Sequence, residues 1–373
     1  MKKSYVLMNK ELPLTEFTLI DIEEDVFSLD DVKEITSSPY SNNKSLKKLI
    51  TTRKPAKNRE HMDKLLTLMQ IKCMSGYLDV SYGLSLNDTL WVKPTEADDS
   101  ISWKSLNLYE NDFNEVIAHY AFCGQGMAGM HMKTTSPEFG TNGMLPKCWK
   151  RVDGKIYLYK GGTSGCSNTG NEPYSEYMAS CLLRALDMPN FAEYSLTKYH
   201  NTLVSSCELF TDMDYGFTPF CNIYNPEFFD DIIEKFDEYG LRSEFNDLMV
   251  FDALIWNPDR HLNNYGFIVN NSTYKIEGMA PIFDNGEGLL PYYTMDKDIE
   301  EYSQKYDVQN SGLSFKSVMA YCLEERHKKM LARLDGFKFP ADPLFDLPTE
   351  RIERLENLLQ KRIRWLCGLD VRI

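Results

Sequence analysis

The most informative part of the sequence reads NPDRHLNN at residues 257–264 and PIFDNG at residues 281–286. Asp259 and Asn264 stand in the first segment and Asp284 in the second. A predicted helix at residues 243–256, with apolar residues on nearly all sides, precedes the first segment, and two short β-type stretches, 266–269 and 273–276, lie between the two. We therefore expect a buried helix, a polar loop and a hairpin that returns Asp284 beside Asn264.

These three side chains fit one kind of chemistry when they are taken together. Phosphoryl transfer needs a carboxylate that accepts the proton of the attacking hydroxyl, and hard oxygen ligands for magnesium. Asp259 suits the first role, and Asn264 and Asp284 suit the second. Taken one at a time, these residues and His261 are ordinary turn and loop formers. Their order along the chain favours a catalytic role.

A lysine and a glutamate form a second candidate pair. Lys160 ends an alternating stretch at residues 156–160, and Glu176 lies in a predicted helix at residues 173–186. Phosphate-transferring enzymes of the kinase type use a strand lysine at the α- and β-phosphates and a helix carboxylate that holds this lysine in place. The alternative is a surface lysine and an exposed helix glutamate.

A glycine- and threonine-rich segment, TTSPEFGTNG at residues 134–143, precedes that strand. Its backbone N–H groups near Gly140 and Gly143 could cover phosphates, as glycine-rich loops do. The segment matches neither a Walker motif nor GxGxxG. An ordinary surface loop is the alternative interpretation.

The motifs at residues 257–264 and 281–286 resemble those of the HipA-like serine/threonine kinases, and phosphoinositide kinases share a related Asp-Arg-His-x-x-Asn pattern. Tyr159-Lys160 and Ser175-Glu176-Tyr177 are similar to further motifs of the HipA-like family. The resemblance implies that Asp259 is the catalytic base, that Asn264 and Asp284 bind magnesium, and that His261 lies near the nucleotide.

The segment LVSSCELFTD at residues 203–212 stands where the resemblance places an interlobe hinge. Glu208 and Phe210 align with the family's Glu-x-Phe-Asp hinge, which implies contact with the nucleotide base. A core strand with a polar end is the alternative. The family's serine-containing loop, which can be autophosphorylated, is not reproduced at residues 134–143.

The expected fold class is α+β, a two-lobed protein-kinase-like fold with a mixed N-lobe that contains strands, a helical C-lobe and a small N-terminal accessory module. We place the accessory module at residues 1–100, the N-lobe at 101–218 and the C-lobe at 219–373. The accessory module is expected to be helical, because apolar residues recur at helical spacing within residues 59–69.

Composition sets limits on the class of protein. With 43% hydrophobic and 13% aromatic residues among 373, the chain should form a compact globule. Its net charge of −14 disfavours direct binding to nucleic acid. No stretch is long and apolar enough to span a bilayer. Nine scattered cysteines without a Cys-x-x-Cys pair favour a cytoplasmic protein without zinc.

The resemblance implies an ATP- and Mg²⁺-dependent kinase that transfers the γ-phosphoryl group to a serine or threonine hydroxyl of a protein substrate, with autophosphorylation as a further expectation. It also implies an antitoxin-type protein partner. Two alternatives remain open at this point. One is a lipid or small-molecule kinase, and the other is a non-catalytic binding module such as a pseudokinase.

Overall fold

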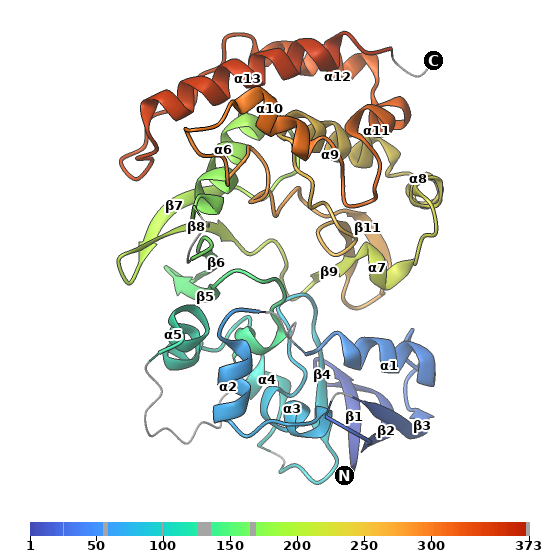
Figure 1. Ribbon diagram of the computed structural model, residues 1–373. Helices are drawn as coiled ribbons and strands as arrows, with labels where there is room; N and C mark the ends of the chain where they lie inside the picture. Colours follow the sequence, from blue (N-terminus) through green and yellow to red (C-terminus); the bar gives the residue numbers. More distant parts are fainter. Residues whose placement is uncertain (25, 55–58, 99, 126–135, 165–168, 371–373) are drawn as a thin grey trace. The chain divides into compact units, whose positions relative to one another are not determined.

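The computed structural model describes residues 1–24, 26–54, 59–98, 100–125, 136–164 and 169–370 (Figure 1). The chain forms two compact units. The first comprises Met1–Tyr159, Thr211–Phe217 and Ile268–Lys275, and the second comprises Lys160–Phe210, Thr218–Phe267 and Ile276–Ile373. Helices and strands are mixed along the chain, which confirms the mixed α and β content of the predicted fold class.

A four-stranded sheet with the order β3-β2-β1-β4 is central to the first unit. It contains β1 (Lys2–Asn9), β2 (Leu12–Asp21), β3 (Phe27–Glu34) and β4 (Leu90–Pro94). β1 pairs antiparallel with β2, with Tyr5 opposite Phe17, and antiparallel with β4. Tyr5 and Phe17 are fully buried and stack on each other with ring centroids 5.7 Å apart.

Three helices complete this part of the first unit: α1 (Asn43–Thr51), α2 (Met62–Leu68) and α3 (Met74–Ser81). α2 matches the helical spacing seen in the sequence, and Met62 and Leu65 are fully buried. The expectation of a helical accessory module was nevertheless wrong, because β1 to β4 form a sheet there. Tyr5 to Met8 is a short continuous apolar run, and periodicity alone does not distinguish such a run in a strand from one in a helix.

The first unit continues with α4 (Trp103–Leu106), α5 (Glu115–Cys123), the short 3₁₀ helix η1 (Pro137–Gly140), β5 (Lys147–Val152) and most of β6 (Lys155–Lys160). One hydrophobic core joins the sheet to α5 and η1, since Ile117, Tyr120 and Phe139 belong to the same buried cluster as Tyr5 and Phe17. Residues before and after position 100 therefore share this core.

The second unit begins with α6 (Glu172–Ala185) and the antiparallel pair β7 (Tyr194–Tyr199) and β8 (Thr202–Glu208). Helices dominate the rest of it. They are α7 (Phe220–Ile223), α8 (Phe229–Glu238), α9 (Arg242–Ile255), α10 (Ile299–Ser303), η2 (Gln304–Tyr306), α11 (Phe315–Cys322), α12 (Glu325–Leu331), η3 (Ala332–Leu334) and α13 (Thr349–Cys367).

The helix α9 is the buried centre that the apolar residues at 243–256 predict. It packs against α8, α11 and α13, and Leu248, Phe251 and Leu254 are almost or fully buried. At its start Phe245 stacks on Phe236 of α8, with ring centroids 4.4 Å apart. The loop that follows α9 therefore begins from a rigid support.

Two short strands follow that loop, β10 (Gly266–Asn270) and β11 (Ile276–Met279). β10, like β9 (Tyr215–Pro219), contains residues of both units. The predicted strand at residues 273–276 was wrong in position, because a turn occupies most of it. The Asn270 side chain accepts hydrogen bonds from the backbone of Ser272 and Thr273 at 3.0 and 2.9 Å, and Tyr274 has a φ of 59°.

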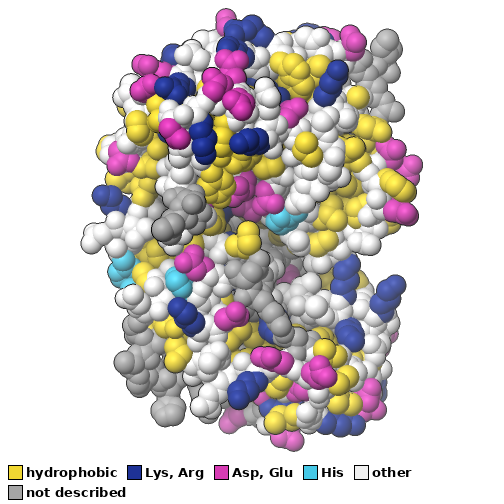
Figure 2. Space-filling model, in the orientation of Figure 1, with side chains coloured by type: hydrophobic (Ala, Val, Ile, Leu, Met, Phe, Trp, Pro, Cys, Tyr) yellow, Lys and Arg dark blue, Asp and Glu magenta, His cyan; other side chains and the backbone are white. Residues whose placement is uncertain are grey.

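Acidic and basic side chains are interspersed on the face of the molecule that Figure 2 draws. None of the helices in the described ranges combines the length and the hydropathy that a bilayer crossing requires. The eight cysteines of the described part of the chain are all free thiols.

Candidate active site

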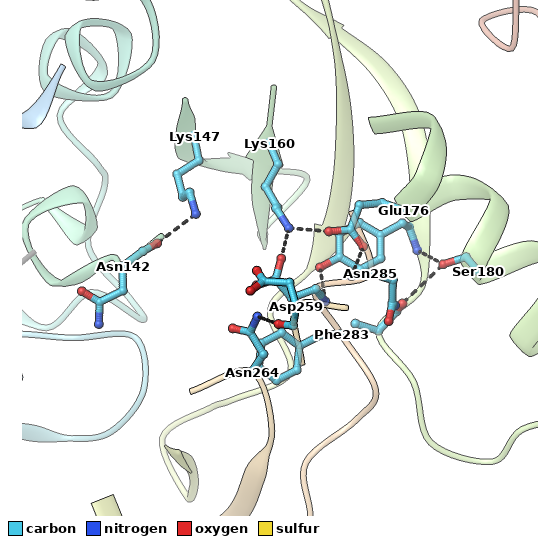
Figure 3. A network of polar contacts seen from close by, with 12 residues as sticks. Asn142, Lys147, Lys160, Glu176, Ser180, Asp259, Asn264, Phe283 and Asn285 are labelled. Atoms are coloured by element: carbon cyan, nitrogen blue, oxygen red, sulfur yellow. Dashed lines mark hydrogen bonds and ion pairs between the residues drawn. The ribbon is translucent and has the colours of Figure 1, made fainter. Parts of the chain in front are cut away.

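The loop at residues 257–264 is held in shape by its own side chains. α9 ends at Ile255, and the residue that follows it, Trp256, has a left-handed φ of 52°. The Asn257 amide then donates to the Asp252 carboxylate at 3.0 Å, and the Asn257 side-chain oxygen accepts the backbone N–H of Asp259 at 3.2 Å. The Asn264 amide donates to the Asp259 carbonyl at 3.4 Å and closes the loop (Figure 3). Asp259 and Asn264 are therefore fixed relative to each other.

Lys160 lies at the centre of the candidate site. Its ammonium group donates to the carboxylates of Glu176 and Asp284, residues that are 16 and 124 positions away in the sequence. The second oxygen of Glu176 accepts the backbone N–H of Asn285 at 2.8 Å (Figure 3). The Lys160 and Glu176 side chains are only 6% and 1% exposed, which excludes the surface interpretation of this pair.

Asp284 itself has an uncommon backbone conformation. Its φ of 57° lies in the left-handed region, which aspartate tolerates better than most residues do. The residues on both sides of Asp284 are held by hydrogen bonds, because the Phe283 carbonyl and the Asn285 side chain both accept from Arg260. The carboxylate of Asp284 is therefore presented from a constrained turn.

Burial and neighbouring charges shift the ionisation of these groups. Burial opposes the charge on Lys160, but the carboxylates of Asp284 and Glu176 outweigh it and raise its pKa. Burial raises the pKa of Glu176, although Lys160 acts in the opposite direction. Burial also raises the pKa of Asp259; His261 opposes this shift and the Asp284 carboxylate adds to it. Perturbed groups gathered in this way are typical of functional sites.

The side chains at Asn264 and Asp284 fit a magnesium ion by their chemistry. One amide and one carboxylate supply only hard oxygen donors, and magnesium in nucleotide sites takes its remaining ligands from phosphates and water. The described residues contain no group of three or more His, Cys, Asp or Glu arranged to hold a metal.

The second unit also contains the predicted nucleotide contacts Glu208, Phe210 and His261. Phe210 packs its ring on Phe283, with centroids 5.5 Å apart, so the predicted hinge lies next to the Asp284 turn. Glu208 is exposed at the end of β8. His261 is half-buried, and its ring nitrogen Nδ1 accepts the Asn263 backbone N–H at 3.3 Å.

Gly140 and Gly143 belong to the first unit. Gly140 ends η1, and Gly143 has a φ of 96°. Next to Gly143, the Lys147 ammonium donates to the Asn142 carbonyl at 2.9 Å. Residues 134 and 135, which begin the predicted phosphate loop, lie outside the described residues. Phosphate contact by this segment stays a prediction.

Two residues that organise the site were missed by sequence reasoning. Asp252 is fully buried in the apolar helix α9 and pairs with the buried guanidinium of Arg260. Asp252 is the one charged residue in the apolar stretch at residues 248–256, and this was the available signal, because a carboxylate is buried in such a place only with a partner.

No model of a known protein family matches the chain. Its sequence is 31% identical over 147 residues to the serine/threonine-protein kinase CtkA of Helicobacter pylori; the match covers 35% of this chain and 42% of that protein, less than half its length. The crystal structure of the proinflammatory kinase CtkA matches 59% of this chain and 92% of that chain with 20% identity and a TM-score of 0.48.

A second solved structure matches nearly the whole chain. It is that of the Shewanella oneidensis HipA, HipB and operator DNA complex, with 13% identity and a TM-score of 0.55 over 98% of this chain and 100% of that chain. At this identity the match concerns the fold alone. The chain is thus homologous to the kinase CtkA and has a fold like that of HipA, which confirms the resemblance to the HipA-like serine/threonine kinases.

Proposed function

We propose that the chain is an ATP-dependent kinase that transfers the γ-phosphoryl group to a serine or threonine hydroxyl of a protein. The observation that supports this most is the buried Lys160 ammonium in contact with both Glu176 and Asp284, since it gathers a strand, a helix and the Asp284 turn around one cation. Homology to a serine/threonine-protein kinase supports the same reaction class.

We assign each residue a role that its position supports. Lys160 binds the nucleotide phosphates, and Glu176 holds its ammonium group in place. Asp259 orients the acceptor hydroxyl and takes its proton, a role that suits a partly buried carboxylate with a raised pKa. Asn264 and Asp284 hold magnesium, which would neutralise the polyphosphate charge when bound. Catalysis of this kind depends on positioning, and the fixed loop meets that need.

The nucleotide base would contact the segment at the end of β8. The proposal assigns Glu208 and Phe210 to this contact, supported by the packing of Phe210 on Phe283 next to the Asp284 turn. His261 is assigned to the nucleotide, and Gly140 and Gly143 to its phosphates. These assignments rest on the sequence resemblance and on the positions of these residues in the structure.

The lobe assignment and the partner also belong to the proposal. Residues 101–218 would form the N-lobe, residues 219–373 the helical C-lobe, and residues 1–100 the accessory module. The HipA structure was solved with HipB and operator DNA, which supports an antitoxin-type protein partner for this chain. With a net charge of −14, the chain would reach DNA through such a partner rather than bind it directly.

The proposal is tested by incubating the purified chain with γ-labelled ATP, magnesium and a mixed extract, beside Asp284→Asn. We expect label on serine or threonine of the chain itself or of an extract protein, and its loss in the variant. Label confined to the lipid fraction would replace the proposal by a lipid kinase. Absence of both nucleotide binding and transfer with any divalent ion would contradict every kinase reading of the site.

A further inference from the structure

Arg260 is the most thoroughly connected side chain around the catalytic loop. It is buried, with a side chain 1% exposed. A guanidinium group carries five N–H donors. Nε and Nη2 donate to the two oxygens of Asp252, both at 2.9 Å, and Nη2 donates again to the Asn285 side chain at 2.7 Å. Nη1 donates to the carbonyls of Asn264, at 3.2 Å, and Phe283. Every donor has an acceptor.

These acceptors come from three separate segments. Asp252 belongs to the buried helix α9, and Asn264 ends the catalytic loop. Phe283 and Asn285 stand immediately before and after Asp284, whose φ is 57°. Arg260 thus joins the rigid helix, the backbone of one proposed magnesium ligand and both neighbours of the other.

We propose that Arg260 is a positioning residue that sets the separation of the Asn264 and Asp284 ligand groups, with Asp252 as its anchor. This inference rests on the proposed function, because it assigns a metal-related role to the same site. A lysine could not replace the guanidinium, since its three donors lack the planar fork that grips Asp252 with two bonds. In Arg260→Lys, at least one of the two hydrogen bonds that hold Phe283 and Asn285 on either side of Asp284 would therefore be lost.

A purely structural role is the competing explanation, because a buried ion pair that loses one partner destabilises a fold wherever it lies. Arg362 in α13 is the matched control. It is also buried, and it donates to the Ala253 carbonyl at 2.7 Å and to the Asp307 carboxylate at 3.0 Å. Arg362→Lys therefore removes a buried guanidinium from the same unit without altering the contacts of Asn264 or Asp284.

The test measures binding of Mn²⁺, used as a spectroscopic probe, in the presence of a non-hydrolysable ATP analogue. Free Mn²⁺ is followed by electron paramagnetic resonance for the wild type, Arg260→Lys and Arg362→Lys, below the melting temperature of each protein. We expect Arg260→Lys to raise the Mn²⁺ dissociation constant roughly 10- to 100-fold, the usual range for outer-shell partners of metal ligands. Arg362→Lys should change it less than about twofold, since it leaves those partners intact.

Asn285→Ala provides a milder variant in case Arg260→Lys does not fold. It removes one acceptor of the guanidinium and should raise the Mn²⁺ dissociation constant several-fold. The inference is overturned if Arg260→Lys binds Mn²⁺ like Arg362→Lys, or if Arg260→Lys is unfolded and Asn285→Ala binds like the wild type. A wild type that neither binds Mn²⁺ with the analogue nor transfers phosphate overturns the proposed function itself, which separates the two failures.

Discussion

Lys160 shows how single residues hold the site together. Its ammonium group is nearly removed from solvent, and two carboxylates keep it charged. Removing one partner of such a buried pair typically costs about 3–5 kcal/mol, because the remaining charge is left uncompensated. A cation held at this point between a strand end and a helix is well placed to meet a phosphate.

Lys160→Ala is expected to lower kcat/KM for ATP by about 10²–10³, the usual loss when a positioned charge-stabilising group is removed. Lys155 lies in the same strand β6 and is exposed, so Lys155→Ala should change kcat/KM less than about twofold. Steady-state kinetics of both variants decide between these outcomes. Equal losses would mean that the strand does not direct Lys160 to the nucleotide.

The ionisation of Asp259 predicts a pH dependence. As the base, Asp259 works only when it is deprotonated, so kcat/KM falls as the pH drops through its pKa. Burial and the Asp284 carboxylate raise this pKa. The acidic limb of the kcat/KM profile should therefore lie above about 3.9, the ordinary value for aspartate. A profile that stays level down to that pH while the protein remains folded would remove Asp259 from this role.

At the level of elements, the start of β10 lies close to the backbone of residues 218–220. A Cβ atom at Gly266 would lie 2.2 Å from the Thr218 carbonyl oxygen and 2.8 Å from the Phe220 nitrogen. Both are backbone atoms, which cannot move away as easily as the end of a flexible side chain. Gly278 in β11 would meet nothing within 4 Å. Residue 266 must be glycine because a side chain has no room there, whereas residue 278 has room for one.

Gly266→Ala is accordingly expected to lower the free energy of unfolding by about 1–3 kcal/mol, the range for overpacking. Gly278→Ala should stay within about 0.5 kcal/mol of the wild type, as surface changes do. Chemical denaturation followed by circular dichroism measures both. A similar stability for the two variants would show that β10 does not need this close approach.

Elements with strong periodicity could be predicted from the sequence, and those specified by distant contacts could not. The helices α6 and α9 begin and end within one residue of the predicted ranges 173–186 and 243–256. The β1–β4 sheet was missed because β1 contains only a short continuous apolar run, Tyr5 to Met8, whose sequence pattern does not separate a strand from a helix. At the site, Lys160, Glu176 and Asp284 were named in advance, whereas the Arg260 and Asp252 pair exists only through tertiary contacts.

At the scale of the whole molecule, the first unit has one core on both sides of position 100. Ile117, Tyr120 and Phe139 are buried in the same cluster as residues of β1 and β2. A chain that starts at residue 101 would expose these side chains, since their partners would be missing. We expect it to lose cooperative thermal unfolding of the first unit and to aggregate, as measured by calorimetry and light scattering. A truncated chain that stays monomeric and unfolds cooperatively would contradict this.

The central claim is that Asp259 promotes transfer of a phosphoryl group from a bound nucleotide to a hydroxyl. The most direct measurement is the single-turnover rate of transfer from ATP by Asp259→Asn, compared with the wild type at saturating nucleotide. We expect the variant to bind a non-hydrolysable ATP analogue as the wild type does and to transfer phosphate more slowly by about 10²–10⁴, the usual contribution of general base catalysis. Transfer by Asp259→Asn at the wild-type rate would contradict the claim.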